Sequence, residues 1–176
     1  MERFMKILFA FFLIFLPHIL SAASSESEIK VAVLGKVTHF VKYKVPAKNE
    51  NFLIVVYKDE AFAKFMQEKY ANKQINHKNV FVKFVTSIEE IQRPNLLYVG
   101  KISQEEQQEL IAYATQHSLF SVSSQSGFAQ RGGVMQLYFL SQKIRFKINL
   151  QAVKKSNLKM SASLLSIATL VKGKQQ

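Results

Sequence analysis

Four segments carry hydrophobic side chains at helical spacing behind a polar residue that can cap a helix. Three of them open with a capping box, in which a Ser is followed three residues later by a Glu, and the fourth opens with an Asp. The four capping residues are Ser25, Ser87, Ser103 and Asp59. We therefore expect helices over residues 26–42, 60–70 and 103–117, and a single helical turn over residues 88–91.

The first of these helices has more apolar surface than one packed face requires. One stripe at helical spacing consists of Ile29, Ala32, Val33, Val37 and Phe40. Further apolar residues off that stripe are Val31, Leu34 and Val41. A helix with this pattern is either largely buried or presents a second face to a partner. A homodimer through that second face is therefore one expectation.

Between the helices lie short hydrophobic runs whose β-branched content favours strands. Residues 51–58, apolar from Phe52 to Tyr57, and residues 96–99 are typical of strands buried on both faces of a parallel sheet. Residues 80–85 alternate more, as expected nearer an edge. Another strand is expected over residues 119–122. The alternation of strand and helix predicts right-handed crossovers and helices on both faces of the sheet.

The end of the chain breaks this alternation. Two strands, over residues 134–140 and 144–148, are separated by only three residues, so they must form an antiparallel hairpin. Helices over residues 150–156 and 162–171 are expected to close the chain. The predicted fold is a single three-layer α/β domain over residues 24–176, with a mainly parallel Rossmann-like sheet and a C-terminal antiparallel hairpin.

The N-terminal pattern predicts an exported protein. Arg3 and Lys6 precede the apolar run of residues 7–16, and Ser21-Ala22-Ala23 supplies small residues suited to a signal peptidase. We expect residues 1–23 to be a cleaved secretory signal peptide and the mature protein to be periplasmic. The alternative is an uncleaved N-terminal anchor.

Composition adds a strong positive charge and removes thiol chemistry. The formal net charge is +12 and there is no Cys in the 176 residues. Export argues against nucleic acid as the reason for this charge, which leaves a solvated basic surface or attraction to anionic lipid or an acidic partner. Disulfides cannot contribute to stability.

The residues offer little for catalysis. The His residues fall in different predicted elements without metal-ligand spacing, no Ser occupies a nucleophile elbow, and no phosphate-binding Gly motif follows the first strand. We therefore expect no enzyme activity, no metal and no cofactor.

The loop over residues 123–133 is the first candidate binding site. It follows the carboxyl end of a predicted parallel strand, where open α/β sheets place their binding crevices. Arg131 adds a fork of donors that could hold a small anion or a partner's carboxylate. Alternatively, Gly127, Gly132 and Gly133 only supply backbone angles for the turn. Phe128 is either a core residue or an exposed anchor.

Two residues of the hairpin strand at 144–148 and its end are further candidates. Arg145 faces away from the apolar side of the strand, where an internal ion pair or an interface with a partner would use it. Asn149 stands where strand meets helix, and would make a good N-cap for the helix that begins at Leu150.

Three motifs near the C-terminus resemble those of the YfiR-like periplasmic proteins. They are Gly127-Phe128-Ala129-Gln130-Arg131-Gly132-Gly133, Arg145-Phe146-Lys147-Ile148-Asn149, and the Ser-x-x-Leu-Leu-x-x-Ala segment of residues 161–168. The end of the first helix, Phe40 to Tyr43, is also similar. The resemblance spans the whole mature chain and is most specific over residues 119–171.

The resemblance implies a non-enzymatic regulator that binds the periplasmic part of an inner-membrane diguanylate cyclase, and so lowers cyclic-di-GMP. It also implies that an outer-membrane lipoprotein could sequester the regulator. A sensor histidine kinase is the alternative partner. A small-ligand or anion-binding protein that uses the 123–133 loop is the alternative function. The lack of Cys is a departure from the best-known member, so thiol-based control does not carry over.

Overall fold

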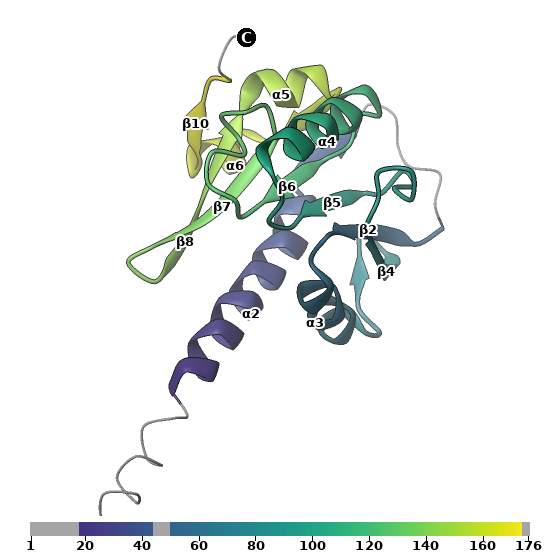
Figure 1. Cartoon of the computed structure of the whole chain (residues 1–176), viewed down its shortest axis with the longest axis vertical. Helices are drawn as coiled ribbons and strands as arrows, with labels where there is room; N and C mark the ends of the chain where they lie inside the picture. The colour runs from purple at the N-terminus through teal and green to yellow at the C-terminus, as the bar shows by residue number, and fades with distance from the viewer. Residues whose placement is uncertain (1–17, 44–49, 174–176) are drawn as a thin grey trace, which may run out of the picture.

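The computed structural model describes residues 18–43 and 50–173, in which helices cover both faces of a curled sheet (Figure 1). The helices are α2 (His18–Thr38), α3 (Glu60–Tyr70), α4 (Gln104–Gln116), α5 (Leu150–Lys155) and α6 (Ala162–Ser166). The strands are β1 (Val41–Tyr43), β2 (Phe52–Tyr57), β3 (Gln74–Ile75), β4 (Lys78–Val85), β5 (Leu96–Val99), β6 (Ser121–Ser123), β7 (Met135–Leu140), β8 (Lys143–Asn149), β9 (Leu158–Met160) and β10 (Thr169–Val171).

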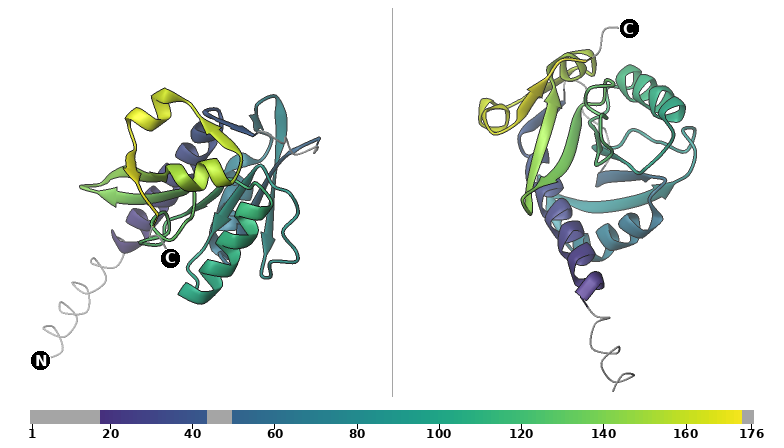
Figure 2. Two further views of the ribbon diagram at one scale, coloured as in Figure 1. Left: turned by 90° about the horizontal axis from the view of Figure 1, so that it is seen from above. Right: turned by 60° about the vertical axis from the view of Figure 1, so that its left-hand side comes forward.

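The main sheet has eight strands in the order β10-β8-β7-β6-β5-β2-β4-β3. Its central pairs, from β4 through β2, β5 and β6 to β7, are all parallel. The hairpin of β7 and β8 is antiparallel, with Leu140 opposite Lys143. The mixed α/β architecture, the mainly parallel sheet and the C-terminal hairpin are thus confirmed, and Figure 2 shows the layers from two further sides.

Two hydrophobic cores lie on opposite faces of the sheet. Alternate residues of β2 divide between them: Ile54 and Val56 face α2 and α3, while Val55 and Tyr57 face α4. All six residues of β2 are buried, which is what an uninterrupted apolar run requires at the centre of a three-layer fold.

The predicted bounds of the first helix are wrong at both ends. Ser25 lies inside α2, which already includes His18, the first described residue. The helix ends at Thr38, and Val41–Tyr43 instead pairs with β9 as an antiparallel strand. Residues 1–17 of the expected signal peptide (residues 1–23) lie outside the described residues, and residues 18–23 belong to α2. None of the helices in the described ranges is long and apolar enough to cross a membrane.

The buried face of α2 also differs from the predicted stripe. Val31, Leu34 and Val37 are buried in the core, whereas Ala32 and Phe40 are exposed. Val31 and Leu34 therefore pack within the chain rather than against a second copy.

The last predicted helix is wrong over its second half. The helix α6 is only five residues long, with Ser161 as its N-cap, and residues 169–171 form β10, which extends the sheet in parallel with β8. The strand β9 was not expected. These short elements are stabilised by pairing with distant strands, which local hydrophobic spacing does not report.

Candidate functional site

The loop between β6 and β7 is packed into the protein by its aromatic residue. Phe128 is fully buried in the core beneath α4, so its reading as a core residue is correct. A side chain on Gly133 would overlap the Phe128 ring, and Gly132 has a φ of +113°, a conformation that favours glycine. The paired glycines thus let the chain pass around the buried ring and enter β7.

Arg131 fastens the same loop to α4. Its Nε donates to Oε1 of Gln107, which is buried on α4, and its Nη2 donates to the carbonyl of Ser126 at 2.6 Å. Gln107 in turn donates to Gln125 at 3.0 Å. Gly127, with a φ of +79°, leaves room for the guanidinium, which a Cβ at that position would overlap. Among the described residues, Arg131 is held by neutral acceptors and not by a carboxylate.

Asn149 joins the loop to the end of β8. Its Nδ2 donates to the carbonyl of Ala129 at 2.7 Å, and its Oδ1 accepts from the amide of Ala152 at 3.0 Å. The second bond is the N-cap of α5 that the sequence predicted. Asn149 is 1% exposed, so both bonds are shielded from water.

Arg145 lies apart from these residues, on the exposed part of the hairpin. It is opposite Tyr138 of β7, and in the described ranges no ion pair joins it to a carboxylate. The internal ion pair proposed as one alternative is therefore not present. Six of the seven candidate residues converge on the loop and its anchor, and Arg145 does not.

The loop forms the floor of a broad groove between α4 and α5. The groove has a volume of about 1890 Å³, and Gly127, Arg131, Gly132 and Asn149 all contribute to its lining. Lys154 and Lys155 of α5 add positive charge, Glu109 of α4 adds one negative charge, and many of the other lining residues carry amide side chains. One of these, Gln130, has a buried Oε1 without a hydrogen-bond partner. The groove can therefore accept a polar or anionic molecule.

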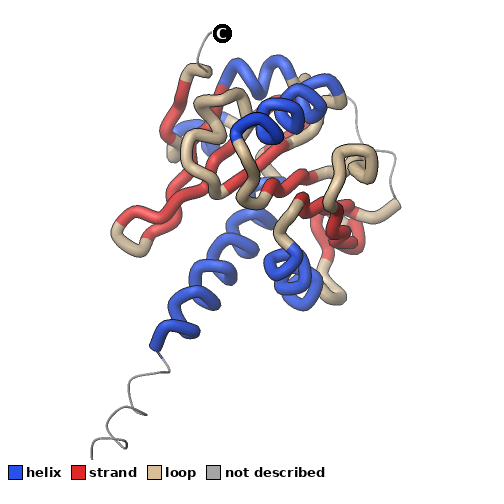
Figure 3. Tube along the Cα trace, viewed as in Figure 1, coloured by secondary structure: helices blue, strands red, loops and turns tan. Residues whose placement is uncertain are grey.

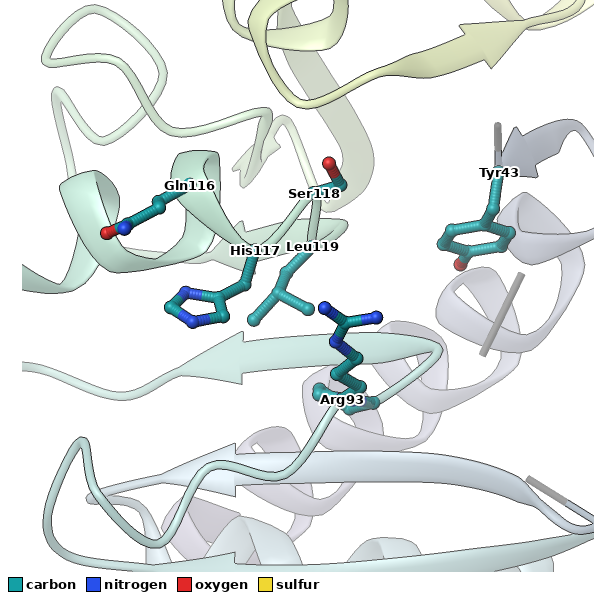
Figure 4. A pocket seen from close by; sticks show the side chains of 7 residues that line it. Tyr43, Arg93, Gln116, His117, Ser118 and Leu119 are labelled. Atoms are coloured by element: carbon teal, nitrogen blue, oxygen red, sulfur yellow. The ribbon is translucent and has the colours of Figure 1, made fainter. Parts of the chain in front are cut away.

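A smaller pocket of about 80 Å³ lies between Tyr43 of β1, the segment that precedes β5 and the segment that follows α4 (Figure 4). Tyr43 and Arg93 line it from one side, and His117 and Leu119 line it from the other. The Tyr43 hydroxyl donates to the carbonyl of Asn95, and the His117 ring stacks on Tyr113 with centroids 4.0 Å apart. At this size the pocket holds no more than a few water molecules.

The point where the strand order reverses, between β2 and β5, is closed. In open α/β sheets a ligand crevice is expected there. Here the amide of Gly100 donates to the carbonyl of Tyr57 at 2.8 Å, and a Cβ on Gly100 would lie 2.5 Å from the carbonyl oxygen of Lys58. The two loops therefore occupy the space that a ligand would need.

A charged cluster beside this closed point was missed in the sequence. Glu106 receives hydrogen bonds from Lys58 at 2.5 Å and from the Tyr57 hydroxyl at 2.6 Å. These two bonds, that of Lys58 foremost, lower the pKa of Glu106. The sequence presents Glu106 as part of a capping box, but its carboxylate ties α4 to β2 instead. No group of three acidic, His or Cys side chains within the described residues could hold a metal ion.

Comparison with known proteins matches the chain to one family. A family model described as YfiR/HmsC-like matches residues 27–169, which is most of the chain. No curated protein matches it.

Solved structures share the fold at low sequence identity. A conserved domain protein from Vibrio cholerae has 14% identity and a TM-score of 0.55 over 83% of this chain and 60% of that chain. An ABC domain from Streptococcus pneumonia in complex with L-Trp has 12% identity and a TM-score of 0.53 over 80% of this chain and 59% of its own. This chain thus spans about three fifths of the length of those structures.

Proposed function

Because the chain belongs to the YfiR/HmsC-like family, we propose that it represses an inner-membrane diguanylate cyclase by binding the periplasmic part of that enzyme. The family is one of periplasmic regulators without catalytic activity. The family match over residues 27–169 is the observation that supports the proposal. The matched range contains the β6–β7 loop (residues 124–134) and Asn149, which holds that loop.

Repression in this proposal is a shift in population. The regulator binds the inactive conformation of the sensor more tightly than the active one, and only this difference in affinity can change the output. A tenfold reduction in the active population requires about 1.4 kcal/mol of differential binding free energy. A rigid protein surface can supply this without any chemical step.

The test measures cyclic-di-GMP in cells that lack the gene. We expect the level to rise several-fold, and to return to the original value when the wild-type chain is supplied from a plasmid. An unchanged level would contradict the cyclase proposal. If the cyclic-di-GMP level is unchanged but the phosphorylation of a response regulator rises, the partner is a sensor kinase.

The groove between α4 and α5 favours a second candidate function, the binding of a small polar or anionic ligand. Arg131 is unsuitable as a test residue because its bonds hold the loop. The variant Lys154→Gln/Lys155→Gln removes two cations from the wall of the groove and leaves the loop intact. Titration calorimetry with phosphate, acetate and free amino acids should show binding that this variant weakens, and no heat with any of them would exclude the candidate at the concentrations used.

A further inference from the structure

The acidic and basic residues of the chain are unevenly distributed. Every Asp and Glu lies at or before Glu109, so residues 110–176 contain no carboxylate side chain. The same segment contains nine basic residues, which are Arg131, Lys143, Arg145, Lys147, Lys154, Lys155, Lys159, Lys172 and Lys174. The positive net charge of the protein is therefore concentrated in its C-terminal part.

The fold turns this separation along the chain into a separation in space. Residues 121–171 form β6 to β10 with α5 and α6, which make up one side of the molecule (Figure 1). The ion pairs Lys58–Glu106, Lys64–Glu60 and Lys69–Glu28 all lie in the other part. Within the described residues, no cation after Glu109 pairs with a carboxylate.

One surface within this basic part is defined by the alternation of side chains along the hairpin. Lys143, Arg145 and Lys147 alternate along β8 and therefore point to the same face of the sheet, about 7 Å apart along the strand. Strand register places Leu140 opposite Lys143 and Tyr138 opposite Arg145 on that face. We call these five residues the hairpin face.

The opposite face of the hairpin belongs to the core, and the cations nearest the turn are exposed. Phe146 and Ile148 point into the core shared with α2 and α3, whereas Arg145 and Lys143 are exposed. The Nζ of Lys147 lies 5.3 Å from the centroid of the Tyr138 ring, a cation–π contact that holds the lysine on the face.

The end of the hairpin projects beyond the body of the protein (Figures 1 and 3). Its turn consists of Ser141 and Gln142, both with positive φ, and beside the turn the side chain of Leu140 is 60% exposed. An apolar side chain beside a lysine at a projecting turn is suited to the boundary between the charged headgroups and the acyl chains of a bilayer.

We propose that the hairpin face binds the phosphodiester headgroups of an anionic phospholipid bilayer. Three cations that share one strand face and form no ion pair within the described residues match an array of negative charge, and Leu140 can enter the boundary of the acyl chains. Among the described residues, other cations of this part lie in separate elements, Lys154 and Lys155 in α5 and Lys159 in β9, and they add long-range attraction rather than a pocket for one acidic segment. Lipid binding of this kind is independent of the proposed function because it requires no partner protein.

The test is co-sedimentation of the purified mature chain with vesicles of phosphatidylethanolamine, with and without phosphatidylglycerol. Wild type should sediment only with the phosphatidylglycerol vesicles, and added salt should release it. The variant Lys143→Gln/Arg145→Gln/Lys147→Gln should bind roughly a hundredfold more weakly, since each cation near an anionic surface contributes a factor of about five.

A matched control loses the same charge elsewhere. The variant Lys36→Gln/Lys73→Gln/Lys101→Gln removes three exposed cations outside the hairpin face, and it should keep most of the binding. Equal losses in the two variants would mean that only net charge matters, and would overturn the proposal. The lipid-binding proposal would also be overturned if the wild type did not bind the vesicles. If the wild type were then retained on immobilised polyglutamate, the occupant of the hairpin face would be an acidic protein segment.

Discussion

Asn149 is the residue on which the loop of residues 124–134 and the last part of the sheet both depend. It is buried and uses both ends of its amide, one to cap α5 and one to hold the Ala129 carbonyl. The loop has few other links to β8, so this one side chain couples the loop to the hairpin.

Replacement of Asn149 should be costly for stability. Asn149→Ala removes a cap and leaves a buried carbonyl unpaired, for an expected loss of about 2 to 4 kcal/mol in the free energy of unfolding. Asn149→Ser keeps a capping oxygen and should lose less. Urea unfolding measures both, with the exposed Asn79→Ala as a control expected within about 0.5 kcal/mol of wild type. A loss no larger than that of the control would show that the two bonds contribute little.

At the scale of single residues, the sequence identified which residues belong to the candidate site better than it identified what each of them does. The spacing of Gly127, Gly132 and Gly133 around Phe128 indicated a turn, and the alternative of a buried Phe128 is confirmed. The role of Arg131 depends on Gln107, which lies on another element, so no local pattern could reveal it. The same holds for the Lys58–Glu106 pair.

Helices with a clear cap and a full apolar stripe were predictable as elements. The helix α3 occupies the predicted residues, and the Asp59 side chain accepts from the amide of Phe62 at 3.1 Å. The strand β10 was mistaken for helix because only its partner β8, more than twenty residues away in the sequence, makes it a strand. Elements of three residues carry too little periodicity to be distinguished locally.

The cap of α3 gives a prediction at the scale of an element. Asp59→Ala should lower the free energy of unfolding by about 1 kcal/mol, because the Phe62 amide loses its acceptor at the first turn of the helix. Asp59→Asn retains a capping oxygen and should stay close to wild type. Thermal unfolding of the two variants distinguishes them, and equal losses would assign the effect to charge rather than to the cap.

At the scale of the whole molecule, buried tyrosines make stability sensitive to alkaline pH. Burial raises the pKa of Tyr70 and of Tyr98 to about 12 in the folded protein, against an ordinary value of about 10. The hydroxyl of Tyr70 donates to the carbonyl of Val31 at 2.6 Å, which ties α3 to α2. Because the folded state holds these protons more tightly, their contribution is complete below about pH 10 and is lost as the pH rises toward about 12.

We therefore expect the free energy of unfolding to fall between about pH 10 and about pH 12. The variant Tyr70→Phe/Tyr98→Phe removes both ionising groups and should show a shallower fall, although it is less stable at neutral pH. Urea unfolding at the two pH values provides the measurement, and the lysines common to both proteins serve as an internal reference. Identical slopes would mean that these two tyrosines do not control the alkaline limit.

The small sheet of β1 and β9 has a consequence for how the chain acquires its structure. Val41 pairs in register with Met160, so the strand that follows α2 depends for its strand pairing on residues more than a hundred positions later in the sequence. Closing such a long loop is slow because the entropy is lost before the contacts form. During synthesis, β1 therefore has no strand partner until β9 has been made.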